Sequence, residues 1–141
     1  MKLKGIILIL SCEKYINTRV KKNFFDVNVN SWRNDWKFVT LKGDINLNSD
    51  YEYDSNKFIL TVKCEDSYIH LLKKRVLGIK YVKKIFDLEE GILCCGDDFV
   101  FNKSLLIKYL NSTDKSDYEG KNTSIPINYD ANNKNLLKNT I

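Results

Sequence analysis

The stretch KGIILILS (residues 4–11) is the first apolar run of the chain, and it indicates the fold class. Apolar residues follow one another without polar alternation and are rich in isoleucine, which is typical of a strand covered on both faces. Three further strand-like runs lie at 36–44, 57–64 and 91–95. Helices are predicted at 14–26, 66–86 and 104–110, and a loop at 45–56. This order predicts an α/β fold, a mostly parallel sheet with helices on its faces.

The segment 66–86 has the clearest amphipathic helix pattern of the chain. Its apolar residues mostly recur three or four positions apart, at Tyr68, Ile69, Leu72, Val76, Ile79, Val82 and Phe86. Asp66 and Ser67 are suitable N-cap residues for such a helix. We expect Tyr68 to pack in the core. The lysines of this helix are expected to form its solvated side, and they are Lys73, Lys74, Lys80, Lys83 and Lys84.

The bulk composition is that of a soluble globular protein. The 141 residues include 43% apolar and 29% charged residues, with a net charge of +5. This length favours one domain with a proper core. The basic residues are interleaved with acids and form no basic stripe with stacking aromatics, so we expect no nucleic-acid partner. The abundance of Asn and Lys is typical of an AT-rich genome, such as that of a large DNA virus.

The cysteines and the N-terminus predict a soluble protein of a reducing compartment. No CxxC pair and no His at ligand spacing accompany Cys12, Cys64, Cys94 and Cys95, so we expect free thiols rather than a zinc site. The apolar run 6–10 is shorter than the roughly 7–15 residues of a signal core and the ~20 of a membrane span. We therefore predict no transmembrane segment and a cytoplasmic location, which for a viral protein means that of a host cell.

Two adjacent carboxylates, Asp97 and Asp98, follow the strand-like run 91–95. An isolated buried carboxylate is costly to ionise, so acids at the end of a buried strand are usually hydrogen-bonded or hold a cation. In parallel sheets, ligands gather at the carboxyl ends of the strands. A pair of carboxylates there suits a hard divalent cation such as Mg²⁺ or Mn²⁺, which completes its coordination with phosphate oxygens.

The run ILTVKCEDSYIHLLKKRVLGIKYV and the later GILCCGDDFVFN together resemble the galactosyltransferase and Fringe-like family of inverting glycosyltransferases. That family has the GT-A fold and carries a DSY-type segment opening a helix, followed by a strand ending in DDDVFVN. Residues 66–68 match the first motif, and residues 97–102 match the second except for the first acid. The resemblance covers roughly residues 4–110, which we expect to form a GT-A-like nucleotide-sugar-binding domain. Residues 111–141 are expected to be a polar, partly loose C-terminal extension.

The resemblance implies a nucleotide-sugar donor, most often uridine diphosphate (UDP)-linked, bridged to the protein by Mn²⁺ or Mg²⁺. Asp98 stands at the position of the usual metal ligand. Asp97 stands at the middle acid, nearer the ribose and sugar, and is included in the predicted metal site. Arg19, Asp66 and Lys74 match positions of the donor site. The partners implied are a UDP-sugar and a glycan or protein acceptor.

The chain departs from the family pattern in two ways. Gly96 replaces the first acid of the DDD motif, and the chain ends before the family's catalytic base and late metal-binding His. Its only His is His70, and no catalytic residue can be assigned. Two functions therefore stay open, a compact metal-dependent glycosyltransferase and a non-catalytic donor-binding half-domain completed by a partner. A shortened sheet edge would also favour a homo-oligomer.

Overall fold

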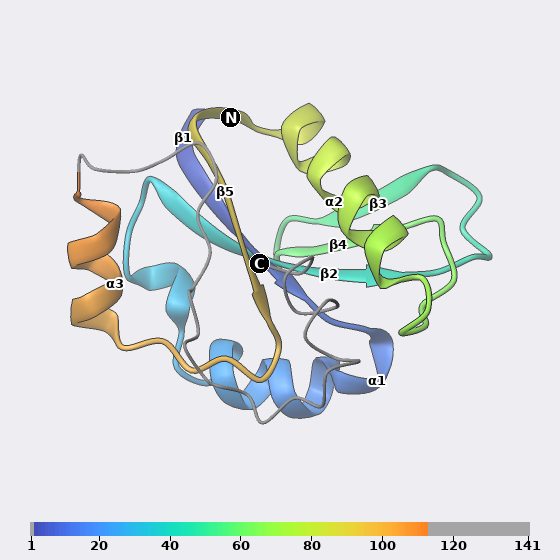
Figure 1. Ribbon diagram of the computed structural model, residues 1–141, viewed down its shortest axis with the longest axis horizontal. Helices are drawn as coiled ribbons and strands as arrows, with labels where there is room; N and C mark the ends of the chain where they lie inside the picture. Colours follow the sequence, from blue (N-terminus) through green and yellow to red (C-terminus); the bar gives the residue numbers. More distant parts are fainter. Residues whose placement is uncertain (1, 113–141) are drawn as a thin grey trace, which may run out of the picture. The chain divides into compact units, whose positions relative to one another are not determined.

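The computed structural model describes residues 2–112 (Figure 1). Its elements are, in order, β1 (Lys2–Leu10), α1 (Glu13–Tyr15), the π-helix η1 (Ile16–Phe25), the 3-10 helix η2 (Val29–Ser31), β2 (Trp36–Gly43), β3 (Tyr51–Asp54), β4 (Ile59–Val62), α2 (Leu71–Ile85), β5 (Asp87–Gly96) and α3 (Lys103–Leu110). The chain to Lys103 is one compact unit, and a second begins at Ser104. Most of the predicted extension 111–141 lies outside the described residues.

A five-stranded sheet with the order β3-β4-β2-β1-β5 forms the centre of the first unit. The strands β4, β2, β1 and β5 run parallel, and β3 pairs antiparallel with β4 at one edge. The predicted α/β class and mostly parallel sheet are confirmed, in a form compatible with a Rossmann-like fold. No helix among the described residues has the length and apolarity to cross a membrane.

The strand β3 corrects the prediction of a loop over 45–56. In YEYD the two tyrosines alternate with two acids, which is the period of a half-buried strand. Tyr51 stacks on Tyr81 of α2 with ring centroids 4.6 Å apart, and Tyr53 meets Phe86 edge-on at 5.5 Å. The loop prediction followed from the surrounding Asn, Ser and Asp residues, because the strand is only four residues long.

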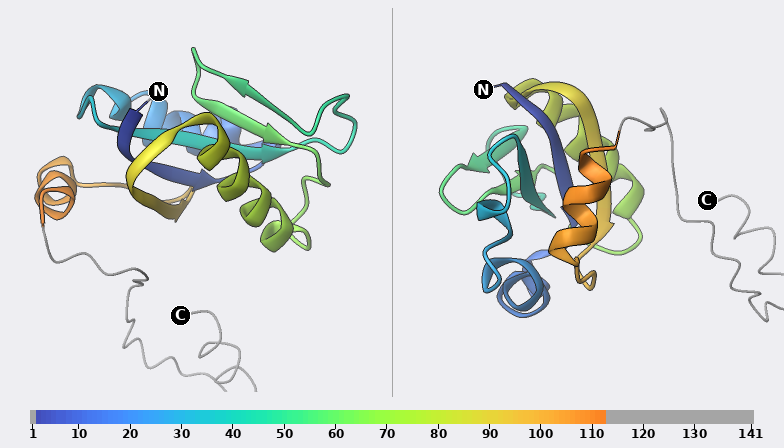
Figure 2. Two further views of the ribbon diagram at one scale, coloured as in Figure 1. Left: turned by 90° about the horizontal axis from the view of Figure 1, so that it is seen from above. Right: turned by 90° about the vertical axis from the view of Figure 1, so that its left-hand side faces the viewer.

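Helices cover both faces of the sheet, which explains the continuous apolar sequence of β1 (Figure 2). On one face, Ile6 and Leu8 join a core cluster with Leu41, Leu60 and Val82, the last contributed by α2. Because successive side chains of a strand alternate, the buried Ile7 and Ile9 point to the opposite face. There the η1 helix, at the position of the predicted helix 14–26, packs Phe24 against Phe38 and Phe101, with centroid separations of 5.9 and 6.4 Å.

The helix α2 begins at Leu71, so the predicted start at Asp66 and its N-cap role are wrong. Tyr68, expected in the core, is 89% exposed, because it lies in the turn before the helix. Lys74, expected in solvent, is only 2% exposed. Its position explains this: Lys74 shares a helix face with Gly78, Tyr81 and Val82, four, seven and eight residues later, and this face packs on the sheet.

A close contact between β1 and β2 gives a first test of the fold. Gly5 is paired with Trp36, and a β-carbon at Gly5 would lie 2.2 Å from the buried indole ring. We expect Gly5→Ala to lower the free energy of unfolding by about 1–3 kcal/mol, the usual cost of overpacking. Urea denaturation measures it. Trp36→Leu in the Gly5→Ala background should cost less than it does alone, and additive losses would contradict the packing.

Candidate functional site

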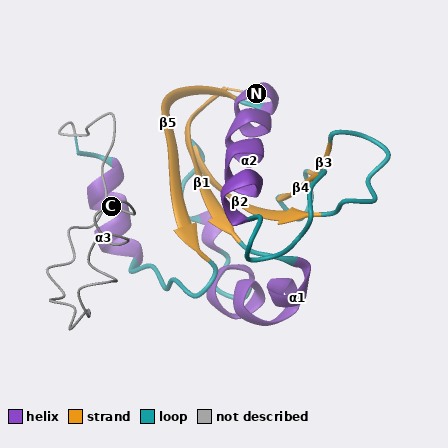
Figure 3. Cartoon of the chain, turned by 45° about the vertical axis from the view of Figure 1, so that its right-hand side comes forward, coloured by secondary structure: helices purple, strands orange, loops and turns teal. Residues whose placement is uncertain are grey.

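The strand order reverses at β1, so the carboxyl ends of β1 and β5 form a topological switch point. The chain leaves β1 through η1 on one face to reach β2, and it reaches β5 from β4 through α2 on the other face. Figure 3 shows the arrowheads of β1 and β5 pointing in the same direction. Ligands of open α/β sheets bind at such switch points. Ser11 follows β1 and Asp97 follows β5, and both are buried.

Asp97 ties the two strand ends together. Ser11 donates its hydroxyl hydrogen bond to Asp97 Oδ2 at 2.9 Å, and Arg19 Nη1 lies 3.5 Å from Oδ1. Asn23 Nδ2 donates to the Asp97 backbone carbonyl at 2.9 Å. The Arg19 guanidinium also lies over the Tyr15 ring, 3.9 Å from its centroid. A carboxylate that is only 8% exposed is thus matched by a hydroxyl donor and a cation.

Asp98 has a different environment from Asp97, although the two are adjacent. Its side chain is exposed and has no hydrogen-bond or ion-pair partner within the described residues. A β-carbon at Gly96 would lie 2.8 Å from Asp98 Oδ1, so the carboxylate folds back over the glycine. A larger residue at 96 would displace it. Of the predicted metal pair, Asp98 therefore offers open oxygens, whereas both Asp97 oxygens already have partners.

Asp66 and Lys74 form a second polar centre at the ends of β1 and β2. Asp66 Oδ1 accepts from the Gly43 backbone N–H at 2.9 Å and Lys74 Nζ at 2.9 Å, and Oδ2 accepts from the Glu13 backbone N–H at 2.7 Å. Lys74 Nζ also donates to the Ser11 carbonyl at 2.5 Å. The pair thereby fixes the ends of β1 and β2 and the start of α1. Asp66 and Lys74 were predicted to contact the nucleotide sugar. In this arrangement they hold the strand ends in position.

Lys74 links the two centres, because the Ser11 backbone that it holds carries the hydroxyl bonded to Asp97. Sequence analysis selected Arg19, Asp66, Lys74, Asp97 and Asp98 but missed Ser11 and Asn23. The signal for Ser11 was available, since it is a small polar residue at the end of the longest apolar run. Asn23 had no such signal, because the sequence gives no indication of which polar residue of η1 faces β5.

The thiols of Cys64, Cys94 and Cys95 are poor nucleophiles. Burial raises the pKa of Cys95 to about 12, and neighbouring Cys94 and the carboxylates of Asp97 and Asp98 add to the shift. Burial also raises the pKa values of Cys94 and Cys64. All four cysteines are free. A neutral thiol does not attack electrophiles readily, so this environment favours a packing role for Cys95.

His70 belongs to a local group at the start of α2. Its Nδ1 lies 2.8 Å from Ser67 Oγ and 3.4 Å from Glu65 Oε2. The ring is partly exposed. Among the described residues, no three His, Cys, Asp or Glu side chains converge into a metal-binding group.

Comparison of the chain with family models, with curated proteins and with solved structures gives no match.

Proposed function

We propose that the first unit is a GT-A-like domain that binds a UDP-linked sugar at the switch point between β1 and β5. The observation that carries the proposal is the Ser11–Asp97 hydrogen bond at the switch point, with the open carboxylate of Asp98 beside it. The resemblance of residues 66–68 and 97–102 to the galactosyltransferase and Fringe-like motifs supports it. The proposed activity is metal-dependent transfer of the sugar to a hydroxyl of a glycan or protein acceptor.

The carboxylates fit a divalent cation only in one mode of binding. Mg²⁺ and Mn²⁺ prefer oxygen ligands, and Mg²⁺ is often held by one or two carboxylates together with substrate phosphates. Asp98 would supply the protein ligand, and Asp97 would need to release Arg19 to join it. Such a cation neutralises a leaving diphosphate when bound. We therefore expect weak affinity for the metal alone and cooperative binding of metal and nucleotide.

The chain's own residues would orient the donor. Arg19 has a side chain that is 48% exposed and a guanidinium already held at the switch point by Asp97 and Tyr15. From there it can donate to phosphate oxygens, for which the planar guanidinium is well suited. Ser11 and Lys74 would keep the end of β1 in place beside the donor.

The transfer step needs a general base within hydrogen-bond reach of the acceptor hydroxyl. Most acids near the switch point already have hydrogen-bond or ion-pair partners. Asp97 is paired with Ser11 and Arg19, and Asp66 is paired with Lys74. Glu13 is paired with Lys42 at 2.5 Å. This observation favours the second candidate function, a donor-binding half-domain that depends on a partner for catalysis. The downstream acids Asp114, Asp117, Glu119 and Asp130 lie outside the described residues.

Calorimetric titration of UDP into the full chain, with and without Mn²⁺, tests the binding. We expect heat of binding that depends on Mn²⁺, and no binding under either condition would refute the donor site. A second assay then separates the two candidate functions. Hydrolysis or transfer of UDP-sugars by the purified chain would support the enzyme, whereas binding without turnover would support the half-domain.

A further inference from the structure

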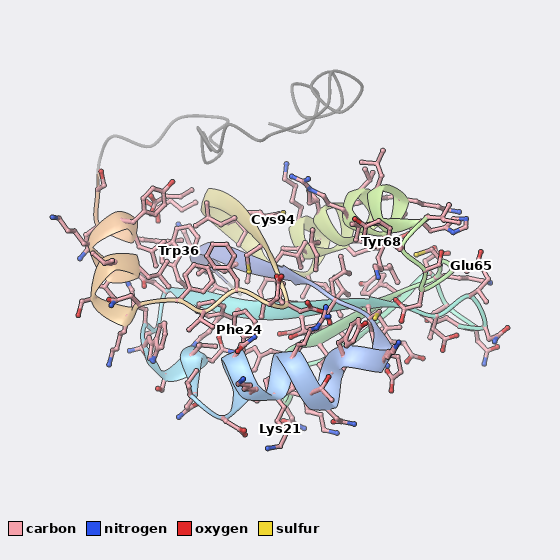
Figure 4. The ribbon with its side chains drawn as sticks, turned by 60° about the horizontal axis from the view of Figure 1, so that its bottom comes forward. Lys21, Phe24, Trp36, Glu65, Tyr68 and Cys94 are labelled. Carbon is pink, nitrogen blue, oxygen red and sulfur yellow. The ribbon has the colours of Figure 1, made fainter. Side chains whose placement is uncertain are left out.

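An apolar ridge extends from the turn before α2 over the exposed side of the first turns of this helix. It consists of Tyr68, Ile69, Leu72 and Val76, whose exposed fractions are 89%, 89%, 73% and 57%. Leu72 and Val76 lie four residues apart and therefore on one side of the helix, and Tyr68 and Ile69 lie in the turn before it. Figure 4 shows Tyr68 beside the start of α2. Single exposed apolar residues are ordinary, but a group of four so close together in the chain indicates an interaction surface.

The ridge is bordered by positive charge. The sequence of α2, LLKKRVLGIKYVKKI, contains six basic residues and no acid, and only Lys74 is buried. Lys73 and Lys80 project on one side of the ridge at helical spacing, and Arg75 lies on the other side near Cys94. The remaining cations, Lys83 and Lys84, lie close to Asp87 and Glu90 near the far end of the helix. The cationic border therefore consists of Lys73, Arg75 and Lys80, with one exposed acid, Glu65, before the start of the helix.

The buried side of α2 holds the helix in place independently of any partner. Gly78 packs so closely on Leu41 that a β-carbon would lie 2.5 Å from a Leu41 methyl group. Tyr81 and Val82 are buried in the same interface. The outward ridge is thus presented by a helix that is already folded, and binding to it does not require the chain to become ordered.

We propose that this ridge, Tyr68, Ile69, Leu72 and Val76 with its border of Lys73, Arg75 and Lys80, docks the protein on the surface of an anionic phospholipid membrane. All four apolar residues are more than half exposed, so they can enter a soft surface without needing a matching groove. Apolar side chains that insert at the acyl boundary, next to lysines that reach the headgroups, are the components of an interfacial anchor. A tyrosine is also favoured at that depth.

The proposal does not depend on the nucleotide site. It has a spatial consequence for that site, because the start of α2 follows Asp66, which is bonded to the end of β2 and the start of α1. Docking through the ridge would hold the carboxyl end of the sheet near the membrane. A sugar acceptor carried by the membrane would then be close to the proposed nucleotide site.

Flotation of the full chain with lipid vesicles tests the proposal. We expect binding to vesicles of phosphatidylcholine and phosphatidylserine to be at least about tenfold tighter than to phosphatidylcholine alone, since each nearby cation contributes about fivefold. Raising the salt well above physiological strength should weaken the binding, because it screens surface charge. Equal absence of binding to both kinds of vesicle would overturn the proposal.

Matched variants separate the ridge from general attraction of a basic protein. Leu72→Asp with Val76→Asp should weaken vesicle binding at least about tenfold, because apolar insertion is lost and repulsion is added. Lys73→Gln with Lys80→Gln should weaken it about twentyfold. The controls are Ile45→Asp and the pair Lys22→Gln with Lys63→Gln, which change exposed residues elsewhere. Equal losses in the controls would contradict the assignment.

Ultracentrifugation of the same variants covers the other possible occupants. All substituted side chains are exposed, so circular dichroism should show unchanged folding. If the chain self-associates, ignores anionic vesicles and becomes monomeric with Leu72→Asp and Val76→Asp, the ridge belongs to a second copy of the chain and the membrane proposal is wrong.

Discussion

Lys74→Met should lower the free energy of unfolding by about 3 kcal/mol, the lower end of the cost of breaking a buried ion pair. The substitution keeps most of the side-chain volume but leaves the Ser11 carbonyl without its lysine donor and Asp66 without its counter-charge. We expect the lower end because Asp66 keeps the backbone N–H groups of Gly43 and Glu13 and is partly exposed. Urea denaturation followed by tryptophan fluorescence measures the change.

Lys73 provides a matched control, because it is the adjacent lysine of the same helix and is exposed. Lys73→Met should change the free energy of unfolding by no more than about 0.5 kcal/mol. Asp66→Asn should also destabilise the protein, since an amide is neutral and accepts through only one of its two terminal atoms. Equal stability of the Lys74 and Lys73 variants would show that the buried pair does not hold the strand ends.

The fold followed from patterns that have a direct physical cause. A continuous apolar strand can exist only where both faces are covered, so residues 4–11 indicated a parallel sheet with helices on two sides. Regular apolar spacing likewise located α2, although not its first turn. The start was misplaced because Asp66 was interpreted as a local cap, whereas its carboxylate bonds to Gly43 and Glu13, which are distant in sequence. No local rule contains such a contact.

The candidate site was predictable only in part, for a related reason. Asp97 and Asp98 were recognisable because two acids directly follow an apolar strand. Their different environments were not predictable. Asp97 is buried by Ser11 and Arg19, which are distant in sequence, whereas Asp98 is exposed. The buried state of Lys74 was hidden by the surrounding lysines. The many lysines of α2 indicated a solvated face. The helix instead packs on the sheet through the face that carries Lys74.

Asp98→Asn should remove the dependence of UDP binding on Mn²⁺, with the affinity in the presence of the metal falling at least about tenfold, or 1.4 kcal/mol. The amide has nearly the same shape but no negative charge, and a hard cation binds a neutral amide oxygen less strongly than a carboxylate. Because Asp98 is exposed and has no hydrogen-bond partner within residues 2–112, stability should change by less than about 0.5 kcal/mol. Calorimetry with and without Mn²⁺ measures the affinity.

Two further variants test whether the effect on binding is specific to the carboxylates at the switch point. Asp50→Asn removes an exposed carboxylate from the loop before β3 and should leave binding unchanged. Asp97→Asn should weaken binding both with and without the metal, because it removes the anchor of Arg19 and alters the bond to Ser11. We therefore expect the Asp97 and Asp98 variants to differ in how UDP binding depends on the metal. If Asp98→Asn retains full metal dependence, or if Asp50→Asn loses it equally, Asp98 is not the metal ligand and the cation binds elsewhere on the chain.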